Sequence, residues 1–125
     1  MSGVRTIAFA LALLSLTASA PASELLYPLV SDWDQQFRIE SQVSTRDGKR
    51  VVSGTVWNTT NWGAKRIQLL IDGLDAGGAI VSQRVVWLGI DLGGGGHAAF
   101  EVAMPPSASY RVSVFAFESR RGRWG

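Results

Sequence analysis

The chain has one histidine as a candidate base or metal ligand, and it directly follows a run of four glycines, Gly93 to Gly96. A single histidine, His97, cannot supply a metal site that needs two or more imidazole ligands. The sequence also lacks the Gly-x-Ser-x-Gly elbow of a serine hydrolase. The glycine run has neither the Lys-Ser/Thr pair nor the following helix of a phosphate-binding loop. We therefore expect His97 to be an exposed residue at the start of a strand.

The carboxylates offer no clearer chemistry. Asp32 and Asp34 lie on either side of Trp33, while Asp72 and Asp75 belong to a predicted strand and the turn after it. Glycosidase carboxylates are recognised by their separation in space, which a sequence does not supply. No aspartate-rich loop has the spacing of a calcium site. These residues predict a protein that is not an enzyme and has no cofactor and no bound metal.

Aromatic side chains are the remaining groups that could form a binding surface. Strand alternation predicts that several large apolar residues point away from the core, where they would form a surface for a protein partner or for self-association. These candidate partner-binding residues are Trp57, Leu70, Phe115 and Phe117. The alternative is that the segment before the first strand, or the C-terminal tail, covers them within one chain.

Two further surfaces are candidates for other ligands. Trp62 lies in the polar loop Asn58 to Gly63, and an exposed indole of this kind can stack on a sugar ring. The C-terminus carries Arg120, Arg121 and Arg123, which could contact an anionic lipid, lipopolysaccharide or peptidoglycan. The alternative for this tail is a solubilising terminus.

The charge balance argues against a nucleic-acid partner. The chain has 12 Lys and Arg residues against 10 Asp and Glu, with a sequence pI of about 9.5. Removal of an N-terminal segment that contains Arg5 would leave 11 against 10. Apart from the C-terminal tail, the basic residues are scattered, whereas a nucleic-acid-binding domain gathers them on one face to displace counterions.

The N-terminus is typical of an export signal. Arg5 precedes an apolar run from Ile7 to Leu16, and Ala20-Pro21-Ala22 supplies the small residues of a cleavage site. We expect residues 1–22 to be a signal peptide cut before Ser23. Cleavage after Ala20 is the competing choice, but it would leave proline next to the cut bond. The apolar run is shorter than the roughly 20 residues of a transmembrane helix, so no transmembrane segment is expected.

Cysteine is absent from the chain, so no disulfide can stabilise the exported protein. Its absence favours a bacterial periplasm or exterior over an animal extracellular space. We therefore expect a periplasmic or secreted bacterial protein that depends on its hydrophobic core.

Apolar and polar residues alternate with a period of two through most of the remaining chain, which predicts strands. Asp47-Gly48 predicts a tight hairpin turn, and Asp75 to Gly78 predicts a second turn. The six predicted strands lie at about 36–44, 51–58, 67–74, 79–88, 99–104 and 110–117. No stretch has a helical period.

This pattern predicts an all-β fold, an antiparallel, immunoglobulin-like two-sheet sandwich of about 6–7 strands over residues 37–118. An N-terminal arm, residues 23–36, precedes it, and a basic tail, residues 119–125, follows it. The arm could be an added strand, a docking segment or a short helical turn. Pro28 argues against a central strand there.

The order of motifs from about residue 38 to residue 117 resembles the FxLYD family of exported prokaryotic domains. The motifs that carry the resemblance are Val52-x-Gly54-x-Val56-x-Asn58, Ile67-x-Leu69-x-Ile71, Asp75-x-Gly77 and the glycine-rich connection before Phe100-x-Val102. At the position of the naming motif, Ile71-Asp72-Gly73-Leu74-Asp75 keeps the final aspartate. The resemblance implies an immunoglobulin-like sandwich and export, and no catalytic activity.

The sequence as a whole predicts a noncatalytic exported bacterial module for protein interaction or assembly. The alternative is a module that binds a carbohydrate or a cell-envelope polysaccharide.

Overall fold

A computed structural model describes residues 24–119 and contains six strands. They are β2 (Phe37–Arg46), β3 (Lys49–Asn58), β4 (Ala64–Leu74), β5 (Ile80–Trp87), β6 (His97–Met104) and β7 (Ser109–Ser119). The 3-10 turn η3 (Trp33–Gln35) lies just before β2. Each predicted strand is present, so the all-β prediction is confirmed.

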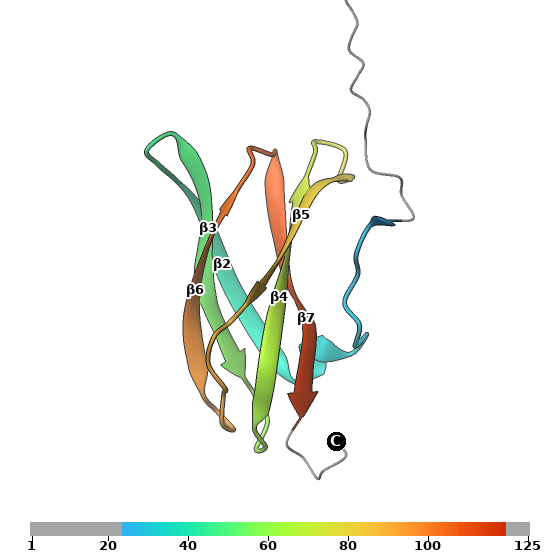
Figure 1. Ribbon diagram of the computed structural model, residues 1–125, viewed down its shortest axis with the longest axis vertical. Helices are drawn as coiled ribbons and strands as arrows, with labels where there is room; N and C mark the ends of the chain where they lie inside the picture. The colour runs from blue at the N-terminus through green and yellow to red at the C-terminus, as the bar shows by residue number, and fades with distance from the viewer. Residues whose placement is uncertain (1–23, 120–125) are drawn as a thin grey trace, which may run out of the picture.

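The strands form two antiparallel sheets of three strands each, packed face to face (Figure 1). The first sheet has the order β2-β3-β6 and the second has the order β5-β4-β7. The predicted hairpin joins β2 to β3, with Asp47 and Gly48 both at positive φ, 53° and 76°. Within residues 24–119 no helix is long and apolar enough to cross a membrane.

The core lies between the two sheets and is built from alternate residues of the central strands. Val52 and Val56 of β3 face Leu69 and Ile71 of β4, and all four side chains are fully buried. Valine, isoleucine and leucine side chains at these positions pack well on a pleated, buried surface. Burial of such side chains stabilises the fold in a chain that has no cysteine for a disulfide.

Gly54 allows β2 and β3 to approach each other closely. A Cβ atom at this position would lie 1.9 Å from the carbonyl oxygen of Glu40, which belongs to the backbone of the neighbouring strand. Any side chain here would therefore push β2 away from β3. We expect Gly54→Ala to lower the free energy of unfolding by about 1–3 kcal/mol, as overpacking does in other interiors.

Urea denaturation of the purified variant measures this loss. Gly77→Ala is the matched control, because its Cβ would make only an ordinary 3.5 Å contact with Asp75 Oδ1. Equal stability of the Gly54 and Gly77 variants would contradict the close approach of the two strands.

Two irregularities in the pairing of β4 with β7 change which side chains face the core. The pairs run from Gln68↔Ala116 directly to Leu69↔Val114, so β7 carries one extra residue there, Phe115. Such a bulge shifts the inward and outward alternation by one position. Phe117 therefore points inward and packs edge-on against Phe37, with ring centroids 4.9 Å apart. The prediction that Phe117 points outward, which assumed an unbroken alternation, is wrong.

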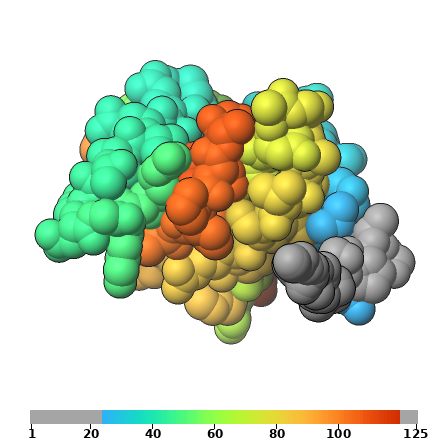
Figure 2. Space-filling view, turned by 90° about the horizontal axis from the view of Figure 1, so that it is seen from above, coloured from blue at the N-terminus to red at the C-terminus, as the bar shows by residue number. Residues whose placement is uncertain are grey.

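The arm before β2 crosses the outer face of the second sheet. The backbone of Leu26 exchanges two hydrogen bonds with the Gln83 side chain of β5, at 2.9 and 2.8 Å. The Leu29 amide then donates to the carbonyl of Phe115 on β7, at 2.8 Å. The arm lies beside the second sheet in Figure 1 and against β5 in Figure 2. It is a docking segment that ends in a 3-10 turn.

The arm explains why the outer face of β4 is buried. Leu70 has no exposed surface and Asp72 has only 2%, although both alternate with the core residues of the same strand. Leu70 is therefore covered within one chain and is not available to a partner. The prediction that Leu70 is an exposed partner-binding residue is wrong. Strand alternation places Leu70 on the outer face of β4, but the arm crosses that face.

Candidate functional site

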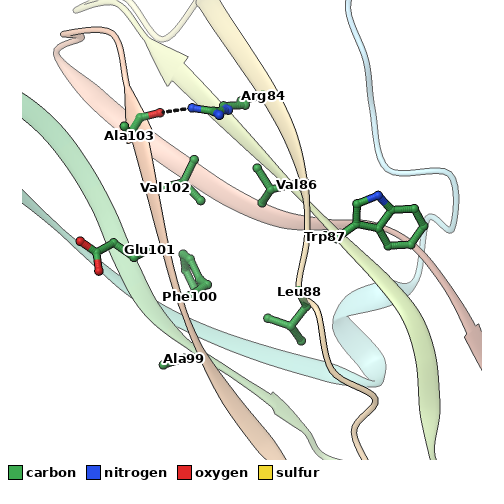
Figure 3. Close-up of a pocket in the computed structure, with 9 residues that line it drawn as sticks. All are labelled: Arg84, Val86, Trp87, Leu88, Ala99, Phe100, Glu101, Val102 and Ala103. Carbon is green, nitrogen blue, oxygen red and sulfur yellow. Dashed lines mark hydrogen bonds between the residues drawn. The ribbon is translucent and has the colours of Figure 1, made fainter.

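The orders of the two sheets leave β5 and β6 as edge strands on the same side of the sandwich. They border a groove of about 390 Å³, shown in Figure 3. The groove is lined by Arg84, Val86, Trp87, Leu88, Ala99, Phe100, Glu101, Val102 and Ala103. The two sheets are therefore not joined along this side, and the groove separates their edge strands.

The floor of the groove is apolar. Val86 and the following Leu88 turn toward the interior from one side, and both pack against the core cluster. Phe100 and Val102 of β6 turn toward them from the other side and are 9% and 6% exposed. Figure 3 shows these four side chains facing one another across the groove, while Trp87 points away from it. The floor is thus a continuation of the hydrophobic core that solvent reaches from one side.

The backbone of β5 presents hydrogen-bonding groups to this groove. The Leu88 amide donates to Ile67 of β4 at 2.9 Å, which places that residue in a hydrogen-bonded pair. In an antiparallel ladder such pairs alternate with pairs whose backbone groups point to the opposite side. The N–H and C=O groups of Val85 and Trp87 therefore point away from β4 and toward the free edge.

The backbone of β6 does the same from the other side. The Arg84 guanidinium donates to the Ala103 carbonyl at 2.9 Å, so the backbone of Ala103 faces β5. By the same alternation, the N–H and C=O groups of Glu101 and Ala99 also face the groove. Two free sheet edges thus present donors and acceptors to one apolar groove, which is the arrangement that accepts an added strand.

The charged groups at the rim already have partners in the chain. Arg84 spans the groove at the Ala103 end, and Glu101 forms an ion pair with Arg46 of β2. Across residues 24–119 no group of three His, Cys, Asp or Glu side chains could hold a metal ion. The groove therefore offers apolar contacts and backbone hydrogen bonds, and not a pair of acid and base groups.

The structure does not bring the four predicted partner-binding residues together. Trp57 lies on the outer face of the first sheet, where the Arg38 guanidinium stacks 4.0 Å from its ring centroid and His97 lies 6.2 Å away. Phe115 is half-buried at the bulge of the second sheet, under the arm. Leu70 is buried on the covered face of β4, and Phe117 is half-buried against the core on the other side of its sheet. These residues therefore do not form one surface.

The carboxylates singled out in the sequence have structural partners. Asp72 accepts hydrogen bonds from Arg111 and Gln83, both at 2.9 Å, on the covered face of the second sheet. Asp75 Oδ1 accepts from the amides of Gly77 and Ala79, both at 2.9 Å, and so closes the β4–β5 turn. The histidine is exposed at the start of β6, as expected.

Some predicted features lie outside the described residues. These are the signal peptide, its cleavage site near Ala22, and the tail arginines Arg120, Arg121 and Arg123. Trp62 is described, and it lies half-buried beside a second hollow at the other side of the sandwich.

Sequence reasoning placed Phe100 and Val102 on a predicted strand, 99–104, but missed the groove that they line. The missing information was the order of the strands, because alternation alone does not say which strands are edges. The one signal in the sequence was a tryptophan, Trp87, near the end of the predicted strand 79–88. The structure leaves it 62% exposed, at the end of an edge strand.

Searches against protein-family models, curated proteins and solved structures found no match to this chain. The resemblance to the FxLYD family therefore stays a prediction, and the function is argued from the geometry of the molecule.

Proposed function

We propose that this chain is a noncatalytic, exported bacterial interaction module that binds an extended segment of a partner protein between β5 and β6. The observation that carries the proposal is the pair of free sheet edges facing each other over an apolar floor. The signal-like residues 1–22 support export to the periplasm or the exterior.

The chemistry of the groove defines the segment that would fit. A strand placed between β5 and β6 would form backbone hydrogen bonds with the N–H and C=O groups that these two edges turn toward the groove. Every second side chain of that strand would point at Val86, Phe100 and Val102, so these positions should be apolar. The alternate side chains would point to solvent and can be polar.

The position of Arg84 determines which end of the bound segment should carry an acidic residue. Its guanidinium lies at the end of the groove where it bonds to the Ala103 carbonyl. A carboxylate of the partner at that end could share this guanidinium, because arginine binds carboxylates through two parallel hydrogen bonds. We therefore expect a segment with alternating apolar residues and an acidic residue toward the Ala103 end.

Selection from a displayed library of random 12-residue peptides tests the proposal on the purified chain. We expect enriched peptides to show this alternation, and Ala99→Pro to weaken their binding about tenfold or more. Proline at this position removes an edge N–H and places a ring in the groove without breaking a bond between β6 and β3.

Val43→Pro is the matched control. Val43 lies on β2, the opposite edge of the same sheet, where the backbone of alternate residues also points to solvent. Peptides should bind this variant as they bind the wild type. The proposal is overturned if no peptide is enriched, or if Ala99→Pro and Val43→Pro bind the enriched peptides equally.

A further inference from the structure

A second hollow of about 560 Å³ lies at the β2 and β7 side of the sandwich, away from the groove. The arm, the loop that follows β3 and the end of β7 form its walls. Its lining residues are Val30, Asp32, Gln35, Gln36, Thr60, Trp62, Phe117 and Ser119. The volume falls within the roughly 300–1,000 Å³ of small-molecule sites.

Two aromatic residues on this wall are held in fixed positions. Phe117 is turned to this side by the bulge in β7 and packs against Phe37. Trp62 belongs to a loop whose backbone is tied down, since its carbonyl accepts hydrogen bonds from Asn58 Nδ2 at 2.8 Å and Thr60 Oγ1 at 3.0 Å. A packed ring at Phe117 and a fixed backbone at Trp62 reduce the reorganisation that an apolar surface needs when a ligand binds.

A buried donor without a partner also lines the hollow. Gln36 is only 9% exposed, and its Nε2 makes no hydrogen bond. The backbone around it is fixed, because the Gln36 carbonyl accepts from the amide and the hydroxyl of Thr59 at 2.8 and 3.0 Å. Buried polar groups are nearly always paired, so this donor would gain a partner if the Gln36 side chain turned toward the hollow and met a ligand acceptor.

The charge of the lining selects among polar ligands. Asp32 supplies the only formal charge among the described residues that line the hollow. A carboxylate repels phosphates and acidic sugars but accepts hydrogen bonds from hydroxyl groups. The lining thus combines aromatic faces, an amide donor and an anionic acceptor.

We propose that this hollow is a binding site for a neutral saccharide. The apolar face of a pyranose ring would pack on Trp62 and Phe117, and one hydroxyl would donate to Asp32. After a turn of the Gln36 side chain toward the hollow, its Nε2 would donate to another hydroxyl oxygen. This site is separate from the β5–β6 groove, so each can exist without the other.

Titration of intrinsic tryptophan fluorescence and calorimetry test the site on the purified chain. The probes are glucose and N-acetylglucosamine as free sugars, cellotetraose and chitotetraose as pieces of a polymer, and putrescine as a cationic ligand. We expect saturable binding of at least one neutral sugar. Preference for a tetramer would identify a polysaccharide as the source, and equal binding of the monomer would identify a free sugar.

Two variants locate the binding. Trp62→Ala should weaken it about tenfold or more, whereas Trp87→Ala, which removes an exposed tryptophan elsewhere, should leave it unchanged. Gln36→Leu should also weaken sugar binding about tenfold, yet it should not lower the melting temperature, because it removes a donor that has no partner in the free protein. If Gln36 had only a structural role, Gln36→Leu would lower the melting temperature and leave sugar binding unchanged.

The outcomes that overturn the proposal are distinct from those for the groove. No saturation with any sugar up to about 10 mM, binding that survives Trp62→Ala, or binding of putrescine alone would each contradict a neutral-saccharide site. Ala99→Pro, which blocks the groove, should bind sugars as the wild type does.

Discussion

Replacing Val56 with aspartate should prevent the domain from folding. Val56 has no exposed surface, and it lies on the central strand of the first sheet between Ile39 and Ala98. A carboxylate there would be buried without a partner, which costs about 4 kcal/mol or more. The whole free energy of unfolding of such a domain is about 5–15 kcal/mol. Circular dichroism should therefore find a largely unfolded chain or a melting temperature lowered by tens of degrees.

Val81→Asp is the matched control for this change, because Val81 is 57% exposed at the start of β5. The same substitution there should change the free energy of unfolding by about 0.5 kcal/mol or less. Wild-type-like melting of Val56→Asp would mean that the inward face of β3 is assigned incorrectly.

Asn58→Ala should cause the second large loss of stability. Asn58 is 1% exposed, and the two N–H groups of its Nδ2 are shared among the carbonyls of Trp62, Leu92 and Gly93, at 2.8, 3.3 and 3.2 Å. Its Oδ1 accepts from the amide and the hydroxyl of Thr60 at 3.1 and 2.7 Å. One side chain thus joins the end of β3 to two loops.

The alanine variant removes these bonds together, although the carbonyls of Trp62, Leu92 and Gly93 each keep one further donor. We expect a loss of about 3–4 kcal/mol in urea denaturation. Asn61→Ala serves as the control, since Asn61 is exposed in the same loop. Loss of the same size in both variants would show that the loop tolerates no change, and would contradict a specific role for the buried amide.

The strands could be predicted because their residues alternate and their turns have specific chemistry. The first hairpin could be predicted because its turn needs positive φ, which Asp47 and Gly48 adopt. The second could be predicted because the Asp75 side chain accepts hydrogen bonds from the turn amides. Asn58 ends its strand with side-chain hydrogen bonds to Thr60 and Trp62, two and four residues further along the chain. These are local effects, and local effects can be read from a sequence.

The candidate site could not be predicted because it depends on non-local arrangement. A bulge at Phe115 turns Phe117 to the side opposite to the one that unbroken alternation predicts. No residue type in β7 indicates that the strand carries an extra residue there. The burial of Leu70 depends on where the arm lies, and Trp57 was grouped with it although the two residues belong to different sheets. The groove depends on the order of the strands, which alternation does not encode.

Amide hydrogen exchange with a bound peptide tests the central claim most directly. The purified chain is measured alone and with the most strongly enriched peptide, and exchange is followed residue by residue. The account predicts new protection at the amides that face the groove, which are those of Val85, Trp87, Ala99, Glu101 and Ala103. The amide of Val43, on the free edge of β2, should exchange at an unchanged rate. Protection at the β2 edge, or no new protection along β5 and β6, would contradict strand addition in the groove.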